Sequence, residues 1–500
     1  MPFSAAIALC PLEAPGRSSC RAVNGQTVPS TGWQSFSAKS GERRKHVSAL
    51  FGALATGCRA TGLYGKKKHP DPSVNYKLKL TMIQLIRGFK DILPGDVERW
   101  QQIENTATSL FEDFGFKEIR IPMMERTELF ARSIGEDTDI VEKEMYTFPD
   151  RKGDLITLRP EATASVVRSY IQHKMYAKDP IRKFYTIGPM FRRERPQKGR
   201  YRQFYQMNVE VLGVTSPLVD VQLILMLVTL FNRLAVSDVT AHINSLGCPD
   251  CRPKYREALS KFLASITNKL CPDCQRRHAR NPLRVLDCKV PSCRETLAEA
   301  PSILDYLCDY CKVDFETVKN FLKKLKIPFV VDKRLVRGLD YYTRTTFEIQ
   351  TGSLGAQSAV AGGGRYDGLI KMLGGPDLPA TGFAIGLDRL AEVSGFDHSD
   401  FIKKTDVFVA ALGSDSQNMA FEWICRLGGR GITAEMDFED RSLKAQMKRA
   451  DRLGASYVLI VGDKELEDGA VILRDMANKE QTTLPIDGIV ESIKNKIHTE

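Results

Sequence analysis

Apolar residues recur at every third or fourth position between Asp96 and Phe114, which predicts a helix with one buried stripe. Asp96 is placed to cap the start of this helix and Gly115 to end it. The next segment, Lys117 to Met123, alternates apolar and polar positions as a strand does. Pro122 cannot donate a ladder hydrogen bond, so this strand is expected at an edge or an interface.

Short strand patterns separated by basic loops follow, which predicts an antiparallel sheet with one functional face. The predicted strands are 156–158, 182–187, 190–195 and 204–212, and a helix is expected from about Pro217 to Leu234. Strand patterns resume at 329–331, 347–350 and 358–362, and Thr381 to Val393 predicts a strand, a turn at Gly386 and a helix.

The pattern changes after Phe401. Short apolar runs at 407–412, 432–435 and 457–461 alternate with helical stretches at about 417–428 and 441–453. This βαβα order predicts a small parallel or mixed α/β domain of roughly 95 residues. A chain of 500 residues is too long for one core. No apolar run approaches the ~20 residues that cross a bilayer, so no membrane association is expected.

Charge is concentrated at the amino-terminal end. Residues 1–79 contain twelve Lys or Arg and three acids, a net +9 of the chain's +11. Global basicity is therefore no argument for nucleic-acid binding. Residues 1–80 are also rich in Ser and Ala and lack a hydrophobic period, which favours an organellar transit peptide, for chloroplast or mitochondrion. The alternative is a disordered basic tail on a cytoplasmic protein.

Eight of the twelve cysteines lie between Cys248 and Cys311, in a segment (248–327) that is otherwise helical in pattern. Without a secretion signal, paired CxxC spacing indicates metal rather than disulfides. The pairs Cys248/Cys251 and Cys271/Cys274, with 19 residues between them, have the spacing of a four-cysteine structural zinc site.

Residues 188–206 form a strand, a basic loop and a second strand. Between Arg192 and Arg202 the loop carries six cations and one acid, enough to hold a phosphate-rich partner. A solvated hairpin with excess charge is the alternative. The order Phe191-Arg-x-Glu-Arg, then Arg200-x-Arg-Gln-Phe, then Glu210 resembles motif 2 of class II aminoacyl-tRNA synthetases, in detail the histidyl-tRNA synthetase family.

Four further segments match the same family. Leu158-Arg-Pro-Glu-Ala-Thr163 resembles its amino-group contact, although a helix start is the alternative for this pattern. Leu335-Val-Arg-Gly-Leu-Asp-Tyr-Tyr342 and Ala361-Gly-Gly-Gly-Arg-Tyr-Asp-Gly368 resemble its two histidine-specific motifs, and Thr381 to Leu390 resembles motif 3. The helix and Pro-ended strand at 96–123 resemble motif 1, which forms the family's dimer interface.

The resemblance implies roles for these residues. Arg192 and Arg337 would hold the α-phosphate, Arg389 the γ-phosphate and Glu194 the adenine end of ATP. The histidine substrate would be bound by Glu161, Ala162, Thr163, Arg192, Gln206, Glu210, Arg337, Tyr341 and Tyr342. The loop between Arg195 and Arg202 would touch the tRNA acceptor end. The carboxylate of an amino acid is already ionised, so a site that activates it needs positive charge and Mg²⁺ rather than a general base.

The expected fold is therefore α+β, with a class II catalytic domain on a mixed antiparallel sheet in two parts (82–247 and 328–400). A helical Cys-rich insertion (248–327) interrupts it, and a C-terminal α/β anticodon-binding domain (401–500) follows. The implied activity is ligation of L-histidine to tRNA(His) with ATP by a homodimer. The alternative is a non-catalytic synthetase-like regulatory or RNA-binding paralogue, which would lose catalytic arginines or the C-terminal domain.

Overall fold

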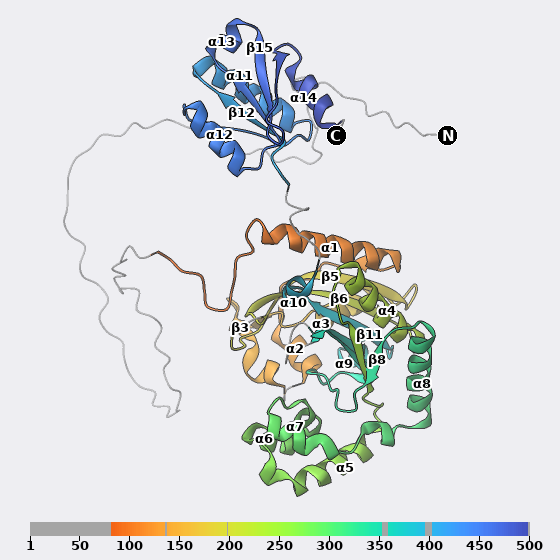
Figure 1. The fold of residues 1–500 in the computed structure, drawn as a ribbon. Helices are drawn as coiled ribbons and strands as arrows, with labels where there is room; N and C mark the ends of the chain where they lie inside the picture. Colours follow the sequence, from red (N-terminus) through yellow and green to blue (C-terminus); the bar gives the residue numbers. More distant parts are fainter. Residues whose placement is uncertain (1–81, 136–137, 198, 353–358, 396–402, 499–500) are drawn as a thin grey trace, which may run out of the picture. The chain divides into compact units, whose positions relative to one another are not determined.

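The computed structural model describes residues 82–135, 138–197, 199–352, 359–395 and 403–498 (Figure 1). An eight-stranded sheet in the order β1-β5-β6-β11-β10-β9-β7-β8 forms its centre. The strands are β1 (Lys117–Glu118), β5 (Arg182–Phe191), β6 (Gln203–Leu212), β7 (Thr240–Ser245), β8 (Phe329–Val331), β9 (Thr343–Gln350), β10 (Ala359–Arg365) and β11 (Ala380–Gly386). The outer pairs β1–β5 and β7–β8 are parallel and the five inner pairs antiparallel, which confirms the mixed antiparallel sheet.

Strand β5 is continuous where the sequence predicted two strands, 182–187 and 190–195. Gly188 and Pro189 stay in register with Gln206 and Tyr205 of β6. Pro189 is tolerated because β1 pairs with β5 only at Phe184 and Tyr185, so no ladder partner is lost on the other side of β5.

Helices α1 (Asp96–Asp113), α4 (Leu218–Arg233), α8 (Asp309–Lys324) and α10 (Leu387–Val393) complete the core around this sheet (Figure 1). The predicted stripe of α1 is buried, with Trp100, Ile103 and Phe111 among its members. Its cap differs from the prediction. Gly95 is the cap residue, with φ of 101°, and its N–H donates to a Glu98 carboxylate oxygen at 2.5 Å. Asp96 instead supplies charge to the first turn.

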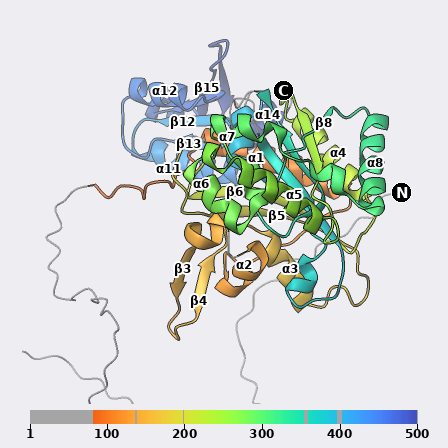
Figure 2. The same ribbon diagram turned by 90° about the horizontal axis from the view of Figure 1, so that it is seen from below.

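The strand expected at Lys117–Met123 is interrupted. Only Lys117 and Glu118 pair with β5, and the chain leaves the sheet after the Ile119 N–H donates to the Tyr185 carbonyl at 2.8 Å. Its continuation, β2 (Met124–Arg126), joins a separate three-stranded sheet with β4 (Leu155–Leu158) and β3 (Tyr146–Pro149), seen as a projecting hairpin in Figure 2. Helices α2 (Thr127–Ile134), α3 (Thr163–Gln172) and α9 (Leu369–Met372) and a π-helical turn (Ile140–Glu144) accompany it.

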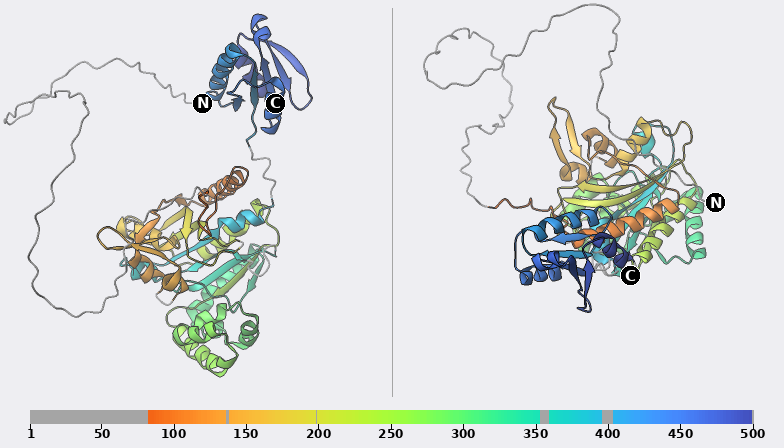
Figure 3. Two further views of the ribbon diagram at one scale, coloured as in Figure 1. Left: turned by 90° about the vertical axis from the view of Figure 1, so that its left-hand side faces the viewer. Right: turned by 90° about the horizontal axis from the view of Figure 1, so that it is seen from above.

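Residues 248–311 form a helical group with a small core of their own, drawn in green in Figure 3. Its helices are α5 (Arg252–Ser265), α6 (Pro272–Arg280) and α7 (Pro291–Thr296), with 3₁₀ turns at Thr267–Lys269, Pro282–Asp287, Leu297–Glu299 and Ile303–Tyr306. Helix α8 then returns the chain to the main core, where Phe315, Val318 and Leu322 are buried.

The C-terminal unit, taken by itself, is a five-stranded sheet in the order β13-β12-β14-β15-β16. Its elements are β12 (Val407–Ala411), α11 (Ser414–Gly428), β13 (Ala434–Met436), α12 (Leu443–Arg452), β14 (Tyr457–Val461), α13 (Asp463–Glu467), β15 (Ala470–Asp475), β16 (Gln481–Pro485) and α14 (Ile489–His498). The three parallel strands were predicted, whereas the antiparallel hairpin β15–β16 was not. Within the described residues, no helix is long and apolar enough to cross a membrane.

Candidate active site

One cavity of about 570 Å³ collects almost every residue singled out in the sequence. It is bordered by β6, the β5–β6 loop, β9 to β11, the start of α10 and the segment 335–342. The predicted residues on its wall are Glu161, Thr163, Arg192, Glu194, Gln206, Glu210, Arg337, Tyr341, Tyr342 and Arg389. Ala162 is fully buried and does not line the cavity.

The segment around Glu161 is a helix start, which is the alternative that the sequence left open for this pattern. Thr163 is the first residue of α3. The Glu161 carboxylate accepts hydrogen bonds from the backbone N–H groups of Thr163 (2.6 Å) and Ala164 (2.9 Å). These two donors have no partner inside the helix, and Glu161 satisfies them. Burial raises the pKa of Glu161 above its ordinary value.

Glu210 is the buried acid at the centre of the cavity wall. The Thr163 hydroxyl donates to Glu210 Oε1 at 2.6 Å, and the Tyr366 hydroxyl donates to Oε2. Burial raises the pKa of Glu210 to about 8, against the pull of these two hydrogen bonds. Both oxygens of this buried carboxyl group are thus held in place by hydrogen bonds, which suits recognition of a polar ring.

Three tyrosines stack beside Glu210. Tyr341 and Tyr342 have ring centroids 4.8 Å apart, and Tyr366 packs edge-on at 5.6 Å from Tyr341. All three are nearly fully buried. Tyr341 and Tyr342 thus form a buried pair, and the glycine-rich segment adds a third ring, Tyr366.

Arg337 reaches across the glycine-rich strand β10. Its guanidinium lies over the Tyr342 ring, 5.5 Å from the centroid, and forms an ion pair with Glu348 of β9. A Cβ atom at Gly362 would lie 2.6 Å from both terminal nitrogens of Arg337. Glycine at position 362 is therefore what allows the guanidinium to pass so close to the backbone.

Arg192 is held at the start of the basic loop. Its Nε donates to the Pro160 carbonyl at 2.8 Å, and its guanidinium lies over the Phe204 ring at 5.3 Å. Glu194 is 3.9 Å from Arg192 and accepts a hydrogen bond from Arg200 at 3.2 Å. These contacts orient Arg192 and Glu194, which both line the cavity.

Arg389 is held by strand β10 and by the β5–β6 loop. It donates from Nη1 to the Ala359 carbonyl at 2.7 Å and from Nε to the Gly199 carbonyl at 3.3 Å. Burial, with repulsion from Arg200, lowers the pKa of Arg389 from its ordinary value. Adjacent Asp388 forms an ion pair with Lys90 at 2.9 Å and accepts from the Tyr205 N–H at 3.0 Å. These bonds fix the start of α10 against β6.

Unpaired polar atoms remain on the cavity wall. Gln206 Oε1, Asn208 Oδ1 and Arg337 Nε are buried and have no hydrogen-bond partner among the described residues. A buried polar atom without a partner costs roughly 1–3 kcal/mol, so these atoms indicate a polar ligand.

Sequence reasoning missed Asn208, Glu348 and Tyr366 as cavity residues. Asn208 could have been found, because Phe204, Gln206, Asn208 and Glu210 alternate along β6 and so share one face. Glu348 and Tyr366 carried no such signal on their own. Arg365, next to Tyr366, points elsewhere and forms a fully buried ion pair with Asp220 at 2.8 Å.

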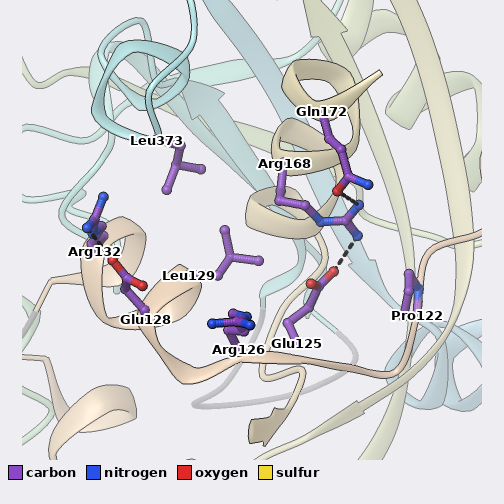
Figure 4. Close-up of a pocket in the computed structure, with 9 residues that line it drawn as sticks. All are labelled: Pro122, Glu125, Arg126, Glu128, Leu129, Arg132, Arg168, Gln172 and Leu373. Atoms are coloured by element: carbon purple, nitrogen blue, oxygen red, sulfur yellow. Dashed lines mark hydrogen bonds and ion pairs between the residues drawn. The ribbon is translucent and has the colours of Figure 1, made fainter. Parts of the chain in front are cut away.

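A second cavity, of about 530 Å³, lies between α2 and α3 (Figure 4). Its wall contains two ion pairs, Arg168 with Glu125 at 2.5 Å and Arg132 with Glu128. The cations there are already matched by carboxylates, and no predicted site residue lines it. The cavity around Glu210 is therefore the candidate active site.

The cysteines assemble differently from the predicted set Cys248, Cys251, Cys271 and Cys274. Two groups of four form instead. Their members are Cys248, Cys251, Cys308 and Cys311, and Cys271, Cys274, Cys288 and Cys293. The predicted set fails because α5, 14 residues long, separates its two pairs by about 20 Å of helix.

Two family models match the chain in the same order as the two folded regions. The model described as histidyl-tRNA synthetase matches residues 88–390. The model described as anticodon binding domain matches residues 406–496.

Curated relatives match over most of their length. A histidine–tRNA ligase of Desulfatibacillum aliphaticivorans is 61% identical over 412 residues, which are 82% of this chain and 98% of the relative. One of Geobacter sulfurreducens is 55% identical over 81% of this chain and 98% of its own. Among solved structures, the apo histidyl-tRNA synthetase of S. aureus is 38% identical with a TM-score of 0.69, covering 83% of this chain and all of the other.

Proposed function

The chain belongs to the histidyl-tRNA synthetase family, and from that premise we propose how its cavity performs histidine–tRNA ligation. The chain is an aminoacyl-tRNA synthetase that joins histidine to tRNA with ATP. The observation that carries the mechanism is the joint presence, in one cavity, of three arginines and the buried Glu210 network.

Activation places the histidine carboxylate in line with the α-phosphate of ATP. Arg192 and Arg337 supply positive charge to the α-phosphate, and Arg389 binds the γ-phosphate. Glu194 contacts the adenine end. Such preorganised charge is worth about 3–4 kcal/mol for each donor aimed at the transition state. Mg²⁺, when bound with ATP, neutralises the pyrophosphate that leaves.

Glu210 and the neighbouring tyrosines recognise the histidine side chain. Glu210 accepts from one ring nitrogen, Tyr342 contacts the other side of the ring, and Tyr341 and Gln206 close the pocket. Thr163 and Glu161 bind the α-ammonium group. A pocket that hydrogen-bonds the ring rejects an apolar analogue by roughly 10⁴-fold, because its polar groups would be left unpaired.

Transfer requires the 3′ end of tRNA to reach the same cavity. The basic loop between Arg195 and Arg202 provides cations for the acceptor end. The anticodon-binding domain, residues 406–496, supplies the second contact with tRNA(His). This division assigns one folded region to chemistry and the other to tRNA selection.

Histidine-dependent exchange of pyrophosphate into ATP tests activation without tRNA, and aminoacylation of tRNA(His) tests transfer. Both activities are expected from the purified chain, and Ala substitution of Arg192 should abolish both. Absence of exchange with histidine, in the presence of tRNA binding, would instead favour the non-catalytic paralogue.

We also propose that residues 1–80 direct the protein to a chloroplast or mitochondrion. The proposal rests on their composition and on their position ahead of the family match, which begins at residue 88. A fusion of residues 1–80 to a fluorescent reporter should accumulate in one or both organelles. A diffuse cytoplasmic signal would contradict the proposal.

The active form is proposed to be a homodimer through the motif 1 region. Met123 and Met124, which follow β1, are about half exposed and offer apolar surface for a second copy. Light scattering of the purified chain should give twice the mass of 56.0 kDa. Structural zinc bound by cysteines of residues 248–311 completes the proposal.

A further inference from the structure

The Cys-rich module, residues 248–311, brings its eight cysteines into two compact groups. In each group the four sulfur atoms lie within 4.8 Å of one another. The outer group is formed by Cys248, Cys251, Cys308 and Cys311, and the inner group by Cys271, Cys274, Cys288 and Cys293.

The sulfur spacing fits a single tetrahedral metal ion. Zn–S bonds of about 2.3 Å place the sulfurs of a tetrahedral site about 3.8 Å apart. The distances are 3.5 Å for Cys248 to Cys251, 3.9 Å for Cys248 to Cys308 and 3.9 Å for Cys271 to Cys288. A disulfide would require about 2.05 Å. All eight thiols are free.

Backbone N–H groups point at the sulfurs in both groups. The Cys308 N–H donates to Cys251 Sγ at 3.2 Å, and the Cys271 N–H donates to Cys293 Sγ at 3.1 Å. Such donors stabilise negative charge on sulfur, which a metal-bound thiolate carries. Six of the eight cysteines are buried, so water cannot take over this role.

The two groups are nested along the chain. The outer group joins the residues where the module begins to those where it ends, and the inner group lies between them in sequence. The module is small, and two of its three α-helices have nine residues or fewer. A core of this size supplies little stability by itself, so a metal or a disulfide adds a constraint that helps it remain folded. Nested metal sites supply that constraint.

Each group also has an arginine that contacts the segment 335–342. Arg252, the neighbour of Cys251, donates to the backbone carbonyl of Tyr342 and, at 3.3 Å, to that of Leu246. Arg284, between the inner ligands Cys274 and Cys288, donates to Asp340 Oδ1 from Nη2 at 3.0 Å and from Nε at 3.3 Å.

Asp340 is in turn fixed against α2. Its backbone N–H donates to the Ile134 carbonyl at 3.1 Å. Gly135, with φ of 101°, leaves room for the Asp340 carboxylate, because a Cβ atom there would lie 2.5 Å from Oδ2. The segment that carries Arg337, Tyr341 and Tyr342 is thus bounded on one side by the module's arginines.

We propose that residues 248–311 bind two Zn²⁺ ions, one in each cysteine group, and that the ions fix Arg252 and Arg284 so that they position the segment 335–342. The metal sites stand on the cysteine geometry alone. The positioning role rests on the proposed function, because its test measures the KM for histidine.

Metal analysis of the full 500-residue chain, purified without chelator, tests the two sites. Two zinc ions per chain are expected, and a mercurial should release them only as it reacts with the eight thiols of the two groups, out of twelve in the chain. Cys288→Ser and Cys308→Ser should each reduce the content to one ion, and Cys425→Ser, which alters an exposed thiol elsewhere, should leave two. A content of one ion or none in the unaltered chain would overturn the proposal.

Cobalt substitution gives a readout that does not depend on the variants folding. Two equivalents of Co²⁺ should produce the absorption of tetrahedral thiolate coordination, with sulfur-to-metal charge transfer. Saturation at one equivalent, or octahedral spectra, would contradict two four-cysteine sites.

Arg284→Ala tests positioning. We expect the KM for histidine in pyrophosphate exchange to rise about tenfold, with the KM for ATP and the zinc content unchanged, and Arg284→Lys to restore part of the loss. Arg276→Ala is the matched control, because Arg276 on α6 pairs only with Asp273 among the contacts of the described residues. An unchanged KM for histidine in Arg284→Ala would refute the positioning role. No exchange by the unaltered chain would refute the proposed function instead and leave the zinc count standing.

Discussion

Gly382 lies directly opposite Glu210 in the pairing of β11 with β6, and a Cβ atom at Gly382 would lie 1.9 Å from Glu210 Oε2. The same carboxylate oxygen accepts the hydrogen bond from Tyr366. Glycine on one strand therefore makes the space in which the acid of the neighbouring strand turns into the cavity. Gly382 belongs to the segment that resembles motif 3, so this segment helps to shape the proposed histidine pocket.

Gly382→Ala should consequently disable histidine recognition. The added methyl group would displace the Glu210 carboxylate from Thr163 and Tyr366, and we expect kcat/KM for histidine to fall at least 100-fold in pyrophosphate exchange. Gly428→Ala, where a Cβ atom meets nothing within 4 Å, is the control and should retain full activity. Full activity of Gly382→Ala would show that the carboxylate position is unimportant.

Glu210→Gln should lose activity but should raise the stability of the protein at high pH. The folded-state pKa of Glu210, about 8, lies above the ordinary value of 4.5, so its contribution to stability is present below pH 4.5 and is lost as pH rises to 8. Gln cannot ionise and avoids this loss. Relative to its effect at pH 4.5, we expect the substitution to add up to about 4 kcal/mol to the free energy of unfolding at pH 9.

Urea unfolding at several pH values measures this difference, with pH 4.5 as the internal reference. A variant that is less stable than the unaltered chain at pH 9 would contradict a buried, proton-retaining Glu210. Histidine-dependent exchange should be lost at every pH, because the amide nitrogen cannot accept a hydrogen bond, whereas both oxygens of the carboxyl group can.

Arg337→Ala should reduce kcat/KM for pyrophosphate exchange by about 10²–10³-fold, the usual effect of removing one charge-stabilising donor. Arg337→Lys should restore little, because an ammonium group cannot reproduce the planar guanidinium over Tyr342. Arg334→Ala, three residues earlier and exposed, is the control. Activity near normal in Arg337→Lys would indicate that charge alone suffices.

Arg195→Ala should separate the two half-reactions. Arg195 is exposed in the basic loop and is not on the cavity wall. We expect unchanged pyrophosphate exchange, weaker aminoacylation, and a slope of log affinity for tRNA against log salt that falls by roughly one. Arg151→Ala, in the β3–β4 turn, should leave both reactions unchanged. A matching loss of exchange in Arg195→Ala would place this residue at ATP instead.

Local patterns predicted those parts of the fold that depend on near neighbours in sequence. The buried stripe of α1 follows from a 3.6-residue period, and the strand β14 from an apolar run that is buried on both faces. The loop between Arg192 and Arg202 could be placed between two strands for the same reason. Family resemblance then assigned chemistry to residues that all reach one cavity, Ala162 excepted.

One local boundary at the cavity could not be predicted in this way. Glu161 caps α3 because the helix begins at Thr163, a boundary that local sequence left ambiguous.

The sequence by itself determined the family, the order of the domains and most of the cavity's residues, because motif spacing and periodicity are local properties of the chain. Only the tertiary structure decided that Cys248 joins Cys308 rather than Cys271, that Gly382 makes room for Glu210, and that Arg284 meets Asp340. Each of these is a contact made across helices or strands that packing brings together, and spacing along the chain carries no measure of that distance.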